Sequence, residues 1–126
     1  MEEPIQRFTF RKEERLHGKK DIARLLAKGK FRSCRRFRYC FIPDNGLPYS
    51  RIMISVPKKL FKRAVKRNLL KRRIRESYRL QKHLGRREKG ADILFIYNSR
   101  EICGSEEIFS TVGQIIKEVG HGQGKS

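Results

Sequence analysis

The residues whose types and spacing most clearly suggest a binding site lie in one stretch, AVKRNLLKRRIRE, at positions 64–76. Because steps of three and four residues return to the same helical face, Asn68, Arg72 and Arg75 are predicted to share one outward ridge. Arg79 continues it, and the forked donors of arginine suit the oxygens of a phosphate. Basic side chains also surround the start of this helix. The full predicted phosphate-binding set is Lys58, Lys59, Lys62, Arg63, Lys66, Arg67, Asn68, Lys71, Arg72, Arg75 and Arg79.

The same spacing places an apolar line on the opposite side of this helix. Leu70, Ile74 and Tyr78 recur at steps of four, which is typical of a helix that faces a core. Ala64 and Val65 begin the outward ridge with small side chains and leave room for a bulky partner. A basic helix face can also be plain solvated surface or a targeting patch, but this one lies opposite a core line and has almost no acidic neighbours.

The overall charge indicates a polyanionic partner. The 126 residues include 32 Lys and Arg against 13 Asp and Glu, a formal net charge of +19. Such a charge opposes compaction by self-repulsion and attracts nucleic acid through counterion release. An anionic membrane surface is the second hypothesis, although no apolar run approaches the ~20 residues of a membrane helix. The N-terminus lacks the apolar centre of a signal peptide, so we expect a cytoplasmic protein.

Side chains that could catalyse a reaction or bind a metal are sparse and scattered. A metal-dependent nuclease needs clustered carboxylates, and a histidine-pair ribonuclease needs two positioned imidazoles. The cysteines form neither a CxxC pair nor an even disulfide set, so we expect them to be reduced. We therefore predict no catalytic residue and no metal site in the protein itself. The scattered residues are Asp21, Asp44, Asp92, His17, His83, His121, Cys34, Cys40 and Cys103.

Periodicity predicts a small α+β fold, built as one domain over residues 1–120. The expected order is α-β-β-α-β-α, in which a long helix joins two parallel strands. Residues 1–12 are expected to be mobile, and the Gly-rich residues 121–126 to be a disordered tail. The predicted elements are helices at 19–28, 61–84 and 105–119 and strands at 31–43, 50–57 and 91–98.

Two consecutive segments resemble the protein subunit of bacterial ribonuclease P. ISVPKK at 54–59 and AVKRNLLKRRIRESYR at 64–79 carry the family's strand ending in Ser-Val-x-Lys-Lys and its helix Ala-Val-x-Arg-Asn-x-x-Lys-Arg-x-x-Arg-Glu. ERLHGKKDIARLLAKGK at 14–30 is similar to the family's first helix. GADILFIYN at 90–98 is similar to the Gly-x-Asp that precedes its last strand. The resemblance covers about residues 8–119.

The resemblance implies a small two-layer α/β sandwich with a left-handed strand–helix–strand crossover, against the general right-handed rule. It also implies that the basic helix binds the catalytic RNA of ribonuclease P, and that the complex removes the 5′ leader from precursor tRNA. The RNA, with Mg²⁺, would carry out cleavage, while the protein alone would be inactive and would need neither a membrane nor an obligatory protein partner. The single-stranded leader would occupy a cleft between the first helix and the sheet. Residues expected there are Ile22, Leu26, Phe37, Tyr39 and Phe41, with simple core packing as the alternative for the three rings.

Several positions depart from the family pattern. Ile22 and Leu26 stand where the first helix often carries aromatic residues, and Cys40 stands where a ring often follows on the strand. Pro57 replaces a small polar residue, and LFKR at 60–63 is one residue longer than the commoner spacer. A loop can absorb that extra residue, so we expect the long helix to keep its direction.

Other functions fit the composition as well. A general or ribosomal RNA-binding protein would have the same charge, and only the ordered motif argues against it. A standalone nuclease is disfavoured by the missing carboxylate cluster. A DNA-architectural protein is disfavoured because no helix-turn-helix spacing or minor-groove arm is evident.

Overall fold

The structure is a computed structural model, and it describes residues 10–85 and 90–121. These residues form a four-stranded sheet with helices on both of its faces, which confirms the predicted α+β class. In chain order the elements are η2 (Lys12–Glu14), α1 (Lys19–Lys28), β1 (Lys30–Cys34), β2 (Phe37–Ile42), β3 (Arg51–Ser55), α2 (Ala64–Gln81), η3 (Lys82–Gly85), β4 (Asp92–Tyr97) and α3 (Ser105–His121).

The strands lie in the order β1-β2-β4-β3. β2 pairs antiparallel with both β1 and β4, whereas β3 pairs parallel with β4. The predicted strand–helix–strand unit is therefore present, with α2 connecting the two parallel neighbours β3 and β4. The left-handed sense of this crossover stays a prediction from the resemblance.

Residues 31–43, predicted as a single strand, instead form a hairpin. Cys34 and Phe37 make the last pair of the β1–β2 ladder, and Arg35 and Arg36 form the two-residue turn between them. Arg35 has φ of 54°, in the left-handed region. Two-residue hairpin turns usually contain Gly, Asn or Asp at such positions, so this turn carries no sequence signal. The observed order is α-β-β-β-α-β-α, and the predicted order was short by one strand.

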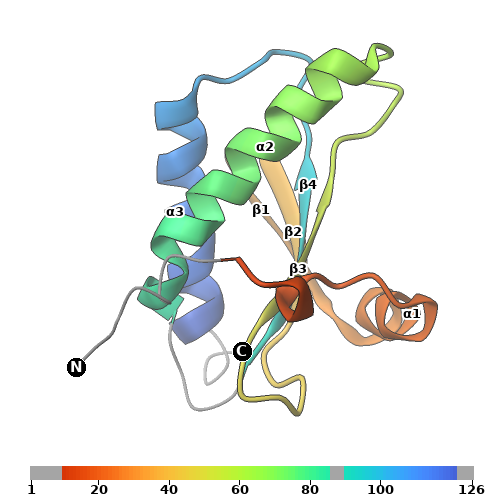
Figure 1. The fold of residues 1–126 in the computed structure, drawn as a ribbon, viewed down its shortest axis with the longest axis vertical. Coiled ribbons are helices and arrows are strands. Elements are labelled where there is room, and N and C mark those ends of the chain that lie inside the picture. The colour runs from red at the N-terminus through yellow and green to blue at the C-terminus, as the bar shows by residue number, and fades with distance from the viewer. Residues whose placement is uncertain (1–9, 86–89, 122–126) are drawn as a thin grey trace.

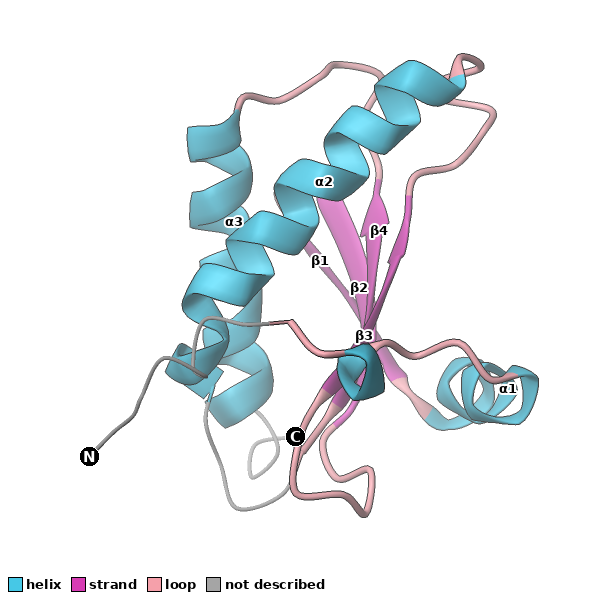
Figure 2. Ribbon diagram, in the orientation of Figure 1, coloured by secondary structure: helices cyan, strands magenta, loops and turns pink. Residues whose placement is uncertain are grey.

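The two faces of the sheet are covered differently, as Figure 1 and Figure 2 show. α2 and α3 lie side by side over one face, while α1 lies against one end of the other face. The larger core lies between the sheet and the α2/α3 pair. α1 therefore adds a partial third layer to the predicted two-layer sandwich. The smaller cluster beneath α1 consists of Leu16, Leu25, Cys40 and Leu94.

α1 has the predicted boundaries, and Gly29 ends it. The Gly29 amide donates to the Leu25 carbonyl at 2.7 Å. A Cβ at position 29 would lie 2.5 Å from the sulfur of Cys40. A glycine is therefore required for α1 to approach β2 this closely.

The long helix is shorter than predicted, because Phe61 is held in the preceding loop. α2 begins at Ala64 and ends at Gln81, followed by the single turn η3, whereas the pattern predicted helix over 61–84. The buried Phe61 ring packs 5.9 Å, centroid to centroid, from Tyr97 of β4. This burial fixes Phe61 against the sheet instead of in the helix.

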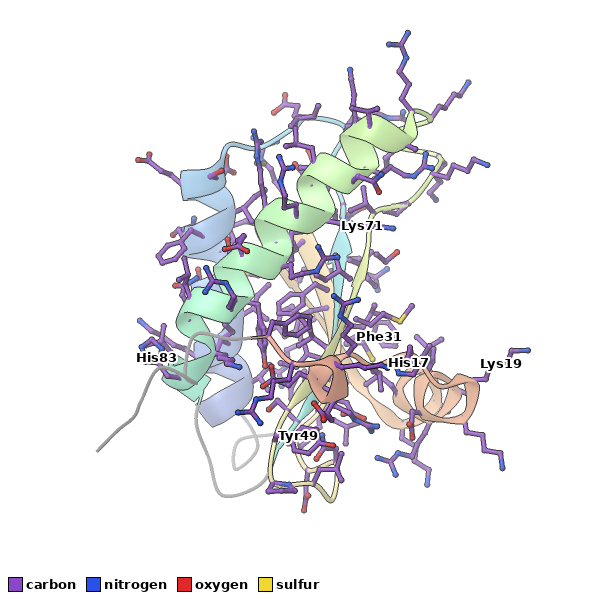
Figure 3. All side chains as sticks on the ribbon, viewed as in Figure 1. His17, Lys19, Phe31, Tyr49, Lys71 and His83 are labelled. Carbon is purple, nitrogen blue, oxygen red and sulfur yellow. The ribbon has the colours of Figure 1, made fainter. Side chains whose placement is uncertain are left out.

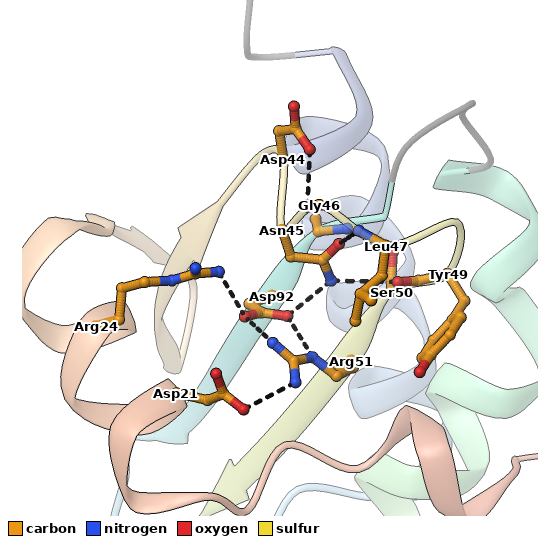
Figure 4. Close-up of polar contacts among 11 residues, drawn as sticks. Asp21, Arg24, Asp44, Asn45, Gly46, Leu47, Tyr49, Ser50, Arg51 and Asp92 are labelled. Carbon is orange, nitrogen blue, oxygen red and sulfur yellow. Dashed lines mark hydrogen bonds and ion pairs between the residues drawn. The ribbon is translucent and has the colours of Figure 1, made fainter.

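A buried ion-pair cluster ties α1 to the sheet (Figure 4). Asp92, at the start of β4, is fully buried and accepts hydrogen bonds from Arg51 Nε at 3.0 Å and Nη2 at 2.8 Å. Asn45 Nδ2 donates to the same carboxylate at 2.8 Å. Arg51 Nη1 also bonds Asp21 of α1 at 3.0 Å. The aspartate of the Gly-x-Asp motif therefore positions a helix and a loop.

The described N-terminal residues lie against the body of the protein. Phe10 meets the Tyr78 ring edge-on, with centroids 6.0 Å apart, and Glu14 bonds Lys82 Nζ at 2.8 Å. Phe10 is thus placed against α2, although it falls in the segment predicted to be mobile. The rest of that prediction and nearly all of the predicted tail lie outside the described residues.

Candidate nucleic-acid interface

The two predicted faces of α2 are present. Leu70, Ile74 and Tyr78 are buried in the larger core, which confirms the apolar line. On the opposite side Asn68 and Arg72 are exposed. The ridge therefore stands away from the core because apolar burial fixes the rotation of the helix about its axis.

Most of the other predicted basic residues lie in the loop before α2 or on its first turns, whereas Arg75 and Arg79 lie further along the helix. Lys71, on α2, is labelled in Figure 3. Arg67, Lys71, Arg75 and Arg79 are partly buried. The exposed members of the set are Lys58, Lys59, Lys62, Arg63 and Lys66.

One ridge cation is partly neutralised by a neighbour on its own helix. Arg79 donates to Glu76 Oε1 from Nη2 at 2.7 Å and from Nε at 3.2 Å. This is an ordinary i,i+3 pair on a helix surface. We therefore regard Arg72 and Arg75 as the stronger candidates for phosphate contact.

Arg67 has a structural contact that the sequence pattern did not indicate. Its Nη1 donates to the carbonyl oxygens of Phe61 and Lys62, at 2.8 Å each. The amide nitrogens of Leu60 and Phe61 turn back to the Pro57 carbonyl, at 3.1 and 3.4 Å. The longer spacer is thus folded into a compact turn, which presents Lys58 and Lys59 to solvent.

The five residues predicted for the leader cleft do not come together. Phe37, Tyr39 and Phe41 are only 2%, 0% and 2% exposed and belong to the core beneath α2 and α3. Ile22 and Leu26 lie on α1, against the opposite face of the sheet. The cleft prediction is therefore wrong for the three rings, whose alternative, core packing, is what the structure shows.

Strand alternation explains this outcome. Side chains two apart share a sheet face, so Arg38, Cys40 and Ile42 face the α1 side while the three rings face away from it. Phe31 pairs with Cys40 in the hairpin register and so shares the α1 side. Its ring is 45% exposed. The sequence pattern missed Phe31 because its face depends on the unrecognised turn at Arg35.

The uncovered part of this sheet face carries an aromatic residue and a cation. The Arg38 guanidinium lies 5.6 Å from the centroid of the Phe31 ring. Met53 of β3 and Ile96 of β4 are partly buried and pack against the cluster beneath α1. Leu26 of α1 is 48% exposed. A ring, a guanidinium and aliphatic side chains together can hold an unstacked base.

The described residues offer few groups for catalysis. Burial raises the pKa of each of the thiols of Cys34, Cys40 and Cys103, so these side chains remain protonated and poorly nucleophilic at neutral pH. Asp21 and Asp92 are brought near each other, but both are bound to Arg51. Across 10–85 and 90–121, no three His, Cys, Asp or Glu side chains gather as a metal site.

No helix within the described residues has both the length and the apolar character needed to cross a bilayer.

The fold and its longest helix define a small, strongly basic α+β protein that carries cations on the side of α2 remote from the core. The chain belongs to the ribonuclease P family, since the family model described as Ribonuclease P matches residues 10–120.

Individual relatives agree with this assignment. The chain is 42% identical over 79 residues to the ribonuclease P protein component of Porphyromonas gingivalis, a match that covers 61% of this chain and 58% of that protein. It is 40% identical over 88 residues to the Thermotoga maritima protein component, covering 70% and 72%. The chain thus matches less than two thirds of the length of the first of these curated relatives.

Solved structures show the same fold. The RNase P protein from Thermotoga maritima superimposes with a TM-score of 0.72 at 30% identity, over 83% of this chain and 96% of that one. The Staphylococcus aureus RNase P protein gives a TM-score of 0.70 at 28% identity, over 82% and 93%. The overall fold of this chain is therefore that of known RNase P proteins.

Proposed function

We propose that this chain is the RNA-binding protein subunit of ribonuclease P. Together with the catalytic RNA it supports endonucleolytic removal of the 5′ leader from precursor tRNA in the cytoplasm. The observation that carries this proposal is the position of Arg72 and Asn68 on a solvent-facing ridge opposite a fully buried line, in a member of this family.

The protein contributes electrostatic binding, and the RNA contributes the chemistry. The ridge cations neutralise backbone phosphates and release counterions, which gives strong, salt-sensitive association. Mg²⁺ would be held by the RNA and would supply the activated nucleophile and charge stabilisation there. What supports this division is that Asp21 and Asp92 are already bound to Arg51, and Glu101 and Glu107 to Arg36.

The leader binds on the uncovered sheet face beside α1. Phe31 offers its exposed ring for stacking, and Arg38 lies over the same ring and places a positive charge beside it. Leu26 supplies an apolar border from α1. These residues contact the leader in place of the three buried rings. Because they contact the leader, they strengthen binding of substrate that carries a leader relative to product that lacks one.

Reconstitution tests the proposal. The protein is combined with a ribonuclease P RNA, and cleavage of a precursor tRNA is measured at low Mg²⁺ concentration. The protein is expected to stimulate cleavage, and the Arg72→Gln/Arg75→Gln variant is expected to need a higher protein concentration for the same rate. A general RNA-binding protein would bind the RNA without stimulating cleavage, and that result would reject the proposal.

A further inference from the structure

A hollow beside the start of α2 is not explained by the family motif. It lies between the loop that precedes α2 and the loop that follows β4, both at the same end of the molecule (Figure 1). Its volume is about 530 Å³, within the range of small-ligand sites. The residues that line it are Leu60, Phe61, Lys62, Arg63, Lys66, Arg100, Glu101 and Ile102.

The hollow combines an apolar lining with a cationic rim. The accessible apolar surface comes from the partly buried Leu60 and from Ile102, which is 38% exposed on the β4–α3 loop, while the buried Phe61 ring lies beneath them against Tyr97. The four rim cations, which are Lys62, Arg63, Lys66 and Arg100, are exposed, and among the described residues they form no ion pair.

Both walls of the hollow are fixed by internal contacts. On one side Arg67 holds the carbonyls of Phe61 and Lys62 at 2.8 Å. On the other side the Tyr97 hydroxyl donates to the Glu101 carbonyl and accepts from the Cys103 amide at 3.0 Å. The hollow is therefore largely formed before any ligand arrives, which reduces the ordering cost of binding.

Glu101 is the one acidic residue in the lining, and its repulsion of a bound anion is weakened by an ion pair. Arg36 Nη1 binds the Glu101 carboxylate at 2.7 Å. Arg36 also bonds Glu107 at 3.0 Å and Ser99 at 3.2 Å. Since Glu101 is already paired, the field in the hollow is set by the four rim cations.

We propose that this hollow binds one unpaired nucleotide of the RNA, with its base on the apolar lining and its flanking phosphates on the rim. The proposal rests on the RNA-binding function proposed above and adds Arg100 and Ile102 to it. In a paired stretch the base faces are covered by stacking and cannot reach Ile102, whereas a base released from its stack presents an apolar face. Charge complementarity selects RNA as the occupant, since four cations surround the apolar lining.

Two RNAs test the proposal. One is a short hairpin, fully paired in its stem and closed by a stable tetraloop; the other carries one additional bulged nucleotide in that stem. The intact protein should bind the bulged RNA five- to tenfold more tightly, about the gain from burying 50 Å² of apolar surface. Ile102→Ser should abolish this preference, and Arg100→Gln should weaken binding of both RNAs and lower the salt dependence.

Matched controls separate the outcomes. Leu84→Ser alters a residue that is also 38% exposed but lies in η3, at the other end of α2, and it should leave the preference intact. Circular dichroism confirms folding of each variant. Equal binding of the two RNAs by the unaltered protein, or an unchanged preference in Ile102→Ser, would overturn the inference. Absence of any salt-sensitive binding would instead reject the proposed function.

Discussion

The guanidinium of Arg67 donates a 2.8 Å hydrogen bond to the carbonyl oxygen of Phe61, joining α2 to the loop before it. The same nitrogen also bonds the Lys62 carbonyl. A residue of the basic motif therefore positions its neighbours as well as adding charge. This contact distinguishes Arg67 from Arg72, which is exposed on the outer ridge.

Arg67→Lys should keep the charge but lose the paired carbonyl contacts. A lysine side chain is one atom shorter, so its ammonium does not reach the position of Arg67 Nη1, the nitrogen that donates to both oxygens. We expect unfolding free energy to fall by about 1 kcal/mol and RNA affinity to fall as the loop loosens. Arg72→Lys is the control, and chemical denaturation should show it to be nearly as stable as the unaltered protein. Equal stability of the two variants would contradict a positioning role for Arg67.

Asp92→Asn should destabilise the fold severely. The buried Asp92 carboxylate accepts two bonds from Arg51 and one from Asn45, and its loss leaves the Arg51 charge poorly compensated. Breaking one side of such a pair costs about 3 kcal/mol. Asp44→Asn, in an exposed turn, should change stability by less than about 0.5 kcal/mol. Thermal unfolding compares the two, and similar melting temperatures would show that the cluster contributes little.

Phe31→Ala should weaken binding of precursor tRNA with a leader and leave binding of mature tRNA unchanged. Loss of one stacking contact should reduce affinity about tenfold. Phe109→Ala provides a control of similar exposure, 43% against 45%, on α3 at the other side of the sheet. Equilibrium binding with both RNAs measures the difference. If both substitutions had the same effect on leader-bearing RNA, the uncovered sheet face would not be the leader site.

Alkaline pH should destabilise the protein through its buried thiols. Burial raises the pKa of Cys40 above its ordinary value of 9.0. The unfolded chain therefore loses this proton at lower pH than the folded chain, so stability is retained below pH ~8 and falls as the pH rises through 9. Urea unfolding at pH 8 and 9.5 should show a smaller loss of stability in Cys40→Ala than in the unaltered protein. Parallel losses in the two proteins would mean that this thiol does not contribute.

The sequence predicted the rotation of α2 from apolar spacing, and the extent of α1 from apolar spacing together with Gly29 as its stop. It could not show that residues 31–43 form two strands, since Arg35 adopts a left-handed turn without a glycine. Because the turn was not predicted, the sequence also did not indicate that Phe31 lies on the α1 side of the sheet. The face occupied by Phe37 depends on which side of the sheet α2 covers, and such long-range packing leaves no local pattern. The Arg67 contacts likewise depend on a loop whose path is set by the burial of Phe61.

The salt dependence of RNA binding tests the central claim most directly. Dissociation constants for a ribonuclease P RNA are measured over a range of monovalent salt for the unaltered protein and for Arg72→Gln/Arg75→Gln. If both arginines contact phosphates, the slope of log affinity against log salt should fall by about 1.4 to 1.8 in the variant. Lys19→Gln/Lys117→Gln removes the same charge from exposed positions on α1 and α3 and should leave the slope nearly unchanged. An unaltered slope in the arginine variant, or an equal fall in both, would show that the ridge is ordinary charged surface.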